Sequence, residues 1–223
     1  MNIQKYSDFE MMAIDVANAV AGDLTATLQH EDRALLAVPG GSTPGPIFDD
    51  LCAADLDWSR VDVILTDERW VPTDSARSNT ALVRERLLVN RASKAQLLPL
   101  YADAPEPEDA ISALIVNLTG LLPIDVAVLG MGPDMHTASL FPDSDELSGA
   151  LDPAAPLLLP VRPQSQPEAR VTLAAHVLNG ALRKHVVFRG EEKYQALEAA
   201  RHLPAKQAPI RAVIDGATVH WTE

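Results

Sequence analysis

Residues 34–45, Ala-Leu-Leu-Ala-Val-Pro-Gly-Gly-Ser-Thr-Pro-Gly, join an uninterrupted apolar run to a glycine-rich turn. The apolar residues 34–38 predict a strand buried on both faces, because a strand with one wet face alternates apolar and polar side chains. Pro44 suits the first turn of a helix after the turn. A buried strand, a tight turn and a helix begin a β-α-β unit, so this segment predicts an α/β fold with a parallel sheet.

The same pattern recurs along the chain. Further apolar runs predict strands at residues 61–65, 124–129, 157–161 and 185–188, and most are separated by stretches of helical character at residues 81–89, 108–118 and 192–200. Near the N-terminus, Ser7 and Glu10 fit a capping box that opens a helix. The proline-rich residues 151–167 indicate an ordered connection, not a linker. We therefore expect one domain over residues 1–223, a three-layer α/β/α fold with a mainly parallel, Rossmann-like sheet.

The composition is that of a globular protein with an excess of acidic residues. The 223 residues include 18 Lys and Arg against 31 Asp and Glu, a formal net charge of −13, and 47% are hydrophobic. The hydrophobic share excludes a disordered chain, and the negative charge argues against a nucleic-acid partner. Cys52 is the one cysteine, which excludes an intrachain disulfide and a cysteine-rich metal site. Without a secretory leader or a membrane-length apolar run, a cytoplasmic protein with no membrane partner is expected.

The glycine-rich turn after residue 38 has the parts of a phosphate cradle. Ligands of parallel sheets bind at the carboxyl ends of the strands, which is where this turn lies. Gly41 lets the backbone turn closely, Ser42 and Thr43 supply hydroxyl groups, and the amides of the next helix would face an anion. No Gly-Lys-Ser/Thr follows, so the turn is not a Walker A loop. The alternative is an ordinary strand-to-helix turn in which Ser42 or Thr43 caps the helix.

Charged residues follow the strand expected at residues 61–65. Asp67 and Arg69 either form a structural ion pair or belong to a ligand site. In a ligand site, Arg69 would bind an anion with two hydrogen bonds. Asp67 would then orient Arg69 or bind a substrate hydroxyl. Asn79 lies just beyond, at the start of the next helix, and its alternative role is a plain N-cap.

The turn after residue 129, Gly-Met-Gly-Pro-Asp-Met-His-Thr, fails the dinucleotide fingerprint because Met135 replaces its third glycine. A nicotinamide cofactor is therefore not expected. His136 is a candidate general base, since Asp134 lies two residues earlier on the same loop, although a lone histidine also serves structural roles. The other histidines share no ligand spacing, so no metal site is expected.

Lys193 lies in the first turns of the helix expected at residues 192–200. A cation there is poorly placed for the helix dipole, which indicates that Lys193 serves something other than the helix. The alternative is a solvated charged face shared with Glu191 and Glu192.

Taken together, these motifs resemble the 6-phosphogluconolactonases, which have the sugar-phosphate isomerase/deaminase-like fold. The most specific string is His-Thr-Ala-Ser-Leu-Phe-Pro at residues 136–142, joined by Asp-Glu-Arg-Trp-Val-Pro at 67–72 and Arg-Val-Thr-Leu at 170–173. The related glucosamine-6-phosphate deaminases usually follow the histidine with an Asn-Glu-containing segment, which this chain lacks. Met135 stands where the lactonases usually have glycine.

The resemblance implies hydrolysis of 6-phospho-D-glucono-1,5-lactone to 6-phospho-D-gluconate, in the oxidative pentose phosphate pathway, without cofactor or metal. It implies that His136 is the general base and that Asp67 and Arg69 complete the catalytic group and line the sugar site. It further implies that the substrate is bound by Gly41, Ser42, Thr43, Asn79, Arg170 and Lys193. A monomer or small homo-oligomer is expected. Two alternatives stay open: a deaminase or isomerase acting on a sugar phosphate, and a non-catalytic sugar-phosphate sensor.

Overall fold

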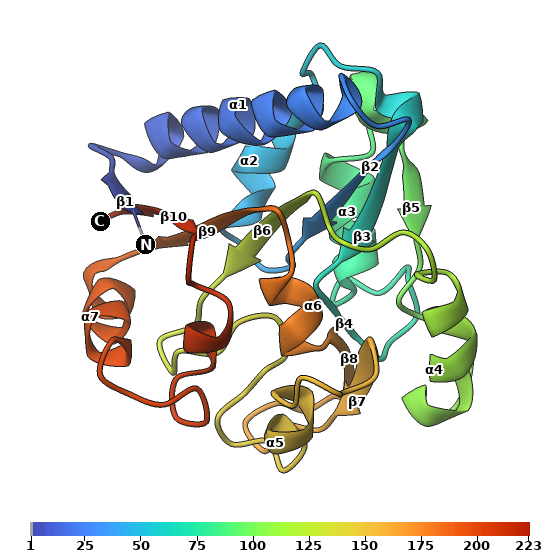
Figure 1. Ribbon diagram of the computed structural model, residues 1–223, viewed down its shortest axis with the longest axis vertical. Helices are drawn as coiled ribbons and strands as arrows, with labels where there is room; N and C mark the ends of the chain where they lie inside the picture. The colour runs from blue at the N-terminus through green and yellow to red at the C-terminus, as the bar shows by residue number, and fades with distance from the viewer. Residues whose placement is uncertain (1) are drawn as a thin grey trace.

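The computed structural model describes residues 2–223, which form a mainly parallel sheet flanked by helices on both sides (Figure 1). All neighbouring strands of this seven-stranded sheet are parallel. Its order is β1 (Asn2–Lys5), β10 (Thr218–Thr222), β9 (Arg183–Arg189), β6 (Val126–Gly130), β2 (Ala34–Val38), β3 (Val61–Leu65) and β5 (Gln96–Leu98). The predicted α/β class with a parallel sheet is confirmed.

The helices lie on the two sides of this sheet. In Figure 1, α1 and α2 lie above it, whereas α6 and α7 lie below. The α-helices are α1 (Phe9–Leu28), α2 (Pro44–Leu51), α3 (Asn79–Arg86), α4 (Pro107–Val116), α5 (Leu147–Ala150), α6 (Ala175–Asn179) and α7 (Glu191–Ala200). Short 3-10 turns occur at Trp58–Arg60, Asn90–Lys94 and Pro209–Ala212. No helix in residues 2–223 is long and apolar enough to span a membrane.

The strands β2 and β3 begin and end where the apolar runs predict, and every residue in both is buried. Helix α1 packs on the sheet through an apolar stripe that includes Met12 and Leu24, both without exposed surface. The predicted capping box is wrong. Asp8 caps α1 by accepting a hydrogen bond from the Met11 amide at 2.8 Å, and Ser7 instead donates to Asp8. A carboxylate is a stronger acceptor for helix amides than a hydroxyl, which accounts for the shift by one residue.

A second, small sheet was not expected. It is antiparallel, in the order β4 (Asp67–Arg69), β8 (Arg170–Leu173) and β7 (Leu158–Val161). Strand β7 lies in the proline-rich connection, where a short strand is predicted. Strand β4 pairs with β8 so that Arg69 lies directly opposite Arg170. The small sheet therefore brings residues from distant parts of the chain to the carboxyl end of β3.

Candidate active site

The loops that follow the parallel strands enclose a cavity of about 310 Å³. All the residues predicted for the site line this cavity: Gly41, Ser42, Thr43, Asp67, Arg69, Asn79, His136, Arg170 and Lys193. They come from the loops after β2 and β6, from β4 and β8, and from the N-termini of α3 and α7. The parallel sheet thus gathers them at one edge, as the rule for ligand sites in α/β sheets predicts.

The His136 ring is held from two directions. Its Nδ1 lies 2.5 Å from Oδ1 of Asp134, and its face stacks on Phe141 with the ring centroids 4.1 Å apart. A Cβ at Gly132 would come within 2.2 Å of the ring, so only glycine permits this approach. Burial is the largest single influence on the Asp134 carboxyl and raises its pKa, but the hydrogen bonds and the charge interaction with His136, together with backbone hydrogen bonding, outweigh burial and lower that pKa below its usual value. A charged Asp134 favours the tautomer with hydrogen on Nδ1, which leaves Nε2 able to accept a proton.

Met135 adopts the backbone conformation that glycine favours at this position. Its φ is 66°, in the left-handed region. Its amide donates to the Gly132 carbonyl at 3.0 Å, and its carbonyl accepts from the Ile210 amide at 3.0 Å. These two hydrogen bonds fix the loop before His136, so a methionine occupies the turn without unfolding it.

Arg69 is oriented by Asn79 and not by Asp67. Its Nη1 donates to Oδ1 of Asn79 at 2.8 Å and to the Arg77 carbonyl at 2.7 Å. The Asn79 amide nitrogen in turn donates to the backbone carbonyl of Asp67 at 2.9 Å. The expectation that the Asp67 carboxylate orients Arg69 is therefore wrong. The alternative that Asn79 is the N-cap of α3 is also wrong, because Ser78 caps this helix.

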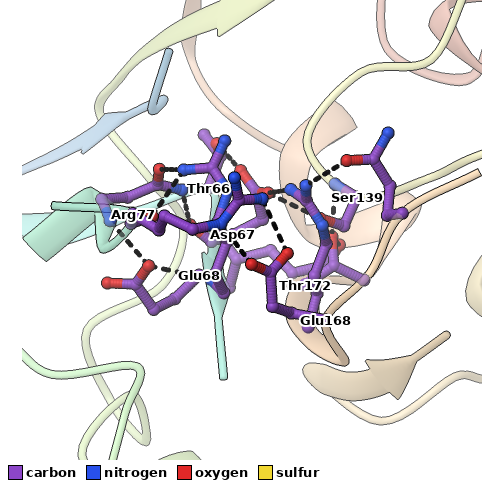
Figure 2. A network of polar contacts seen from close by, with 12 residues as sticks. Thr66, Asp67, Glu68, Arg77, Ser139, Glu168 and Thr172 are labelled. Atoms are coloured by element: carbon purple, nitrogen blue, oxygen red, sulfur yellow. Dashed lines mark hydrogen bonds and ion pairs between the residues drawn. The ribbon is translucent and has the colours of Figure 1, made fainter. Parts of the chain in front are cut away.

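The Asp67 carboxylate lies in a buried hydrogen-bond network (Figure 2). It accepts from Ser139 at 2.5 Å, from Thr66 at 3.1 Å and from Arg170 at 3.5 Å. Arg170 also donates to Gln166 at 2.8 Å, and its guanidinium lies 5.3 Å above the Phe141 ring. Burial lowers the pKa of Arg170, while Asp67 opposes that effect. This network fixes Arg170 at the cavity wall.

Two arginines that line the cavity each have one nitrogen without a hydrogen-bond partner in the part of the chain that the structure describes. The Nε atoms of Arg69 and Arg170 are both buried and have no hydrogen-bond partner within residues 2–223. The guanidinium groups of these two arginines also place positive charge at the cavity, which suits an anionic or hydroxyl-bearing ligand.

The turn after β2 has the shape expected of an anion cradle. Gly41 has a φ of +93°, and Pro44 begins α2. Thr43 occupies the N-cap position of α2 but makes no side-chain cap hydrogen bond, so its hydroxyl is available to a ligand. Lys193 lines the same cavity, and burial together with the nearby Arg189 lowers its pKa.

Comparison with known proteins places the chain in a family. A family model described as glucosamine-6-phosphate isomerases/6-phosphogluconolactonase matches residues 7–221. The chain belongs to this family.

Relatives in the glucosamine-6-phosphate isomerase/6-phosphogluconolactonase family match nearly the whole chain. A 6-phosphogluconolactonase of Mesorhizobium japonicum is 43% identical over 220 residues, which cover 97% of this chain and 91% of the relative. One of Pseudomonas aeruginosa is 40% identical, covering 99% and 94%. The crystal structure of a 6-phosphogluconolactonase from Shewanella baltica has a TM-score of 0.96 at 34% identity, covering 100% of this chain and 98% of that one.

In this family member, sequence reasoning missed several residues of the site. Ser139 and Gln166 contact Asp67 and Arg170, and Glu68 holds the start of α3. Ser139 lies within the family string at 136–142, which was the one signal that could have found it. Gln166 lies in the proline-rich connection, where no motif marks it. The assembled site combines a histidine free to accept a proton, a carboxylate that orients that histidine, and cations for an anion.

Proposed function

We propose that this chain hydrolyses 6-phospho-D-glucono-1,5-lactone to 6-phospho-D-gluconate, a step of the oxidative pentose phosphate pathway. One observation carries the proposal: His136, whose ring is held by Asp134, lines the same cavity as the cradle at Gly41–Thr43 and Lys193. A base at one wall and an anion cradle at another fit a lactone that carries a remote phosphate. The relatives named 6-phosphogluconolactonase match this chain over almost its whole length and support the same reaction.

The reaction needs one base that later acts as an acid. Nε2 of His136 takes a proton from water while the water oxygen bonds to C1 of the lactone. The tetrahedral intermediate then breaks its bond between C1 and the ring oxygen, and the imidazolium returns the proton to that oxygen. Asp134 stabilises the imidazolium through Nδ1. General acid–base assistance of this kind contributes about 10²- to 10⁴-fold.

The cations of the cavity bind and orient the substrate. The helix-start amides of α2 and the Lys193 ammonium hold the 6-phosphate, because an anion is favoured at a helix N-terminus and beside a cation. Arg69 and Arg170, which line the same cavity, bind oxygen atoms of the sugar through their guanidinium groups. Holding the phosphate away from C1 converts binding energy into orientation at the reacting carbonyl.

The test is the rate of lactone decay. The lactone is generated in situ from glucose 6-phosphate by a dehydrogenase, and its disappearance is followed with and without the protein. Acceleration over the spontaneous rate is expected. Folded protein that leaves the rate unchanged would overturn the proposal. Release of ammonia from glucosamine 6-phosphate would then support a deaminase, and binding without turnover would support a sensor.

Two finer expectations belong to the same proposal. The enzyme is a monomer or a small homo-oligomer, which light scattering coupled to gel filtration measures. The enzyme is located in the cytoplasm, in keeping with a reaction of central sugar metabolism.

A further inference from the structure

Strand β4 presents three charged side chains in succession, and only two of them line the cavity. Asp67 and Arg69 line it, whereas Glu68 does not. Successive side chains of a strand point to opposite faces, so Glu68 points away from the cavity. Glu68 has no exposed surface. A buried carboxylate is costly unless its oxygens are hydrogen-bonded, so its partners show what it is for.

Both oxygens of Glu68 are fully used, and the donors belong to β4 and the start of α3 (Figure 2). Oε1 accepts from the amides of Arg69 at 2.8 Å and Asn79 at 2.7 Å. Oε2 accepts from the Thr80 amide at 2.7 Å and the Ser78 hydroxyl at 3.0 Å. The first turn of α3 contains no acidic residue of its own, so Glu68 supplies the negative charge that stabilises a helix N-terminus.

Asn79 links this anchor to the cavity. Its side chain receives the hydrogen bond of Arg69 at 2.8 Å and donates to the Asp67 carbonyl at 2.9 Å. It also lies against the phosphate cradle, since a Cβ at Gly40 would come within 1.9 Å of its Oδ1. The position of Asn79 therefore determines how Arg69 and the cradle sit relative to each other.

We propose that Glu68 is a positioning residue for the reaction: by anchoring the start of α3 to β4 it places Asn79, and through Asn79 it orients Arg69 beside the cradle. The inference rests on the proposed lactonase function for its kinetic consequence. Its structural consequence is independent of that function.

The variant Glu68→Gln keeps the shape of the side chain but replaces one acceptor oxygen with a donor. In either orientation of the new amide, a backbone amide of Arg69, Asn79 or Thr80 loses its acceptor. We expect kcat/KM for the lactone to fall by about 10- to 100-fold, because displacements near 1 Å in a positioned group cost that much.

The matched control is Asp62→Asn. Asp62 is another buried carboxylate, held by Arg33 at 2.8 Å near the start of β3, at the opposite end of the sheet from the cavity. Both substitutions lower the unfolding temperature, but only Glu68→Gln changes kcat or KM at a temperature where both variants are folded. Wild-type kcat/KM in folded Glu68→Gln would overturn the proposal.

A double-mutant cycle separates positioning from a general loss of stability. In an Asn79→Ala background, Glu68→Gln should cost little further kcat/KM, because the residue through which it acts is already gone. Asp62→Asn should leave kcat/KM unchanged in both backgrounds. If the loss of kcat/KM in the double variant equals the product of the losses in the two single variants, the proposal is contradicted.

A crystal structure of Glu68→Gln decides the matter without reference to activity. Displacement of Asn79 from Arg69 supports the proposal, and an intact 2.8 Å hydrogen bond between them overturns it. Absence of lactonase activity in the wild-type protein would therefore remove the proposed function and still leave this readout. If Glu68→Gln does not fold, Ser78→Ala removes one of the four donors and carries the same measurements with a smaller effect.

Discussion

His136 is fixed on two sides, by Asp134 at Nδ1 and by Phe141 at its face, which leaves Nε2 for the reaction. We expect His136→Ala to lower kcat by about 10²- to 10⁴-fold, the usual contribution of a general base. KM should change little because the cradle proposed to bind the phosphate is untouched. The exposed His30 supplies the control, since His30→Ala should leave kcat and KM unchanged. Steady-state kinetics with lactone generated in situ measures kcat and KM of both variants. A wild-type kcat in His136→Ala would mean that another residue is the general base.

Met135 tests how tightly the turn before His136 is constrained. A non-glycine residue in the left-handed region costs about 1–2 kcal/mol, and a β-branched residue fits there worse than methionine. Met135→Gly should keep kcat near the wild-type value, because glycine favours the observed φ of 66°. Met135→Ile should lower both kcat and the free energy of unfolding. Urea titration and lactone kinetics on the two variants give the comparison. Equal kcat and equal free energy of unfolding in both would show that the left-handed conformation of residue 135 does not constrain the turn.

At the scale of single residues, sequence could name many of the polar residues of the cavity but few of their hydrogen-bond partners. Glycine-rich turns and charges after buried strands indicated where His136, Arg69 and Lys193 lie, because strand ends meet at one sheet edge. The pairing of Asp67 with Arg170 was not foreseen, since it depends on two strands 103 residues apart in sequence. Glu68 was also overlooked, because burial of its side chain follows from the alternation of β4 and not from a motif.

Strands β9 and β10 carry a buried chain of hydrogen bonds under α1. His220 lies 2.8 Å from the Tyr6 hydroxyl and 3.1 Å from His185, which reaches Asp23 of α1 at 2.9 Å. Arg183 lies 3.9 Å from the same Asp23 carboxylate. Burial, with His185 as the second cause, lowers the pKa of His220 to about 4.

The depressed pKa of His220 predicts acid sensitivity of the fold. Below pH 6.5, the approximate pKa of His220 in the unfolded chain, the unfolded chain binds a proton at His220, whereas the folded chain binds it only near pH 4. The free energy of unfolding therefore falls as the pH falls from about 6.5 to about 4. The full loss is about 3 kcal/mol. Urea unfolding at about pH 7 and about pH 5 measures about 2 kcal/mol of it, because pH 5 still lies above the folded-state pKa. His220→Gln should shrink the difference between the two pH values, and an unchanged difference would assign the sensitivity to other groups.

At the scale of elements, apolar continuity predicted the central strands and missed the edges. The strands β2 and β3 are buried on both faces, so their sequences are apolar throughout. By contrast, β1 at the sheet edge is largely exposed, and β4 consists of three charged residues. Those strands form because a neighbour supplies the pairing, which a local pattern does not encode. Single-domain organisation of residues 1–223 stays a prediction.

The whole molecule carries a net charge of −13, yet its cavity is lined by Arg69, Arg170 and Lys193. An anion is repelled by the overall field and is held only where these cations and helix amides converge. The charge distribution therefore predicts that affinity depends on the phosphate and is localised in the cavity, not spread over the surface.

Ligand-dependent stability tests this prediction on the intact protein. At about 100 times its dissociation constant, the product 6-phosphogluconate should stabilise the fold by about 2.7 kcal/mol and raise the Tm by roughly 5 to 10 °C. Gluconate at the same concentration, lacking the phosphate, should produce a much smaller shift. Lys193→Ala should reduce the shift given by 6-phosphogluconate, whereas Lys206→Ala, on an exposed site, should retain it. Equal shifts for the two ligands would mean that the phosphate contributes nothing, and the cradle at Gly41–Thr43 would then need another occupant.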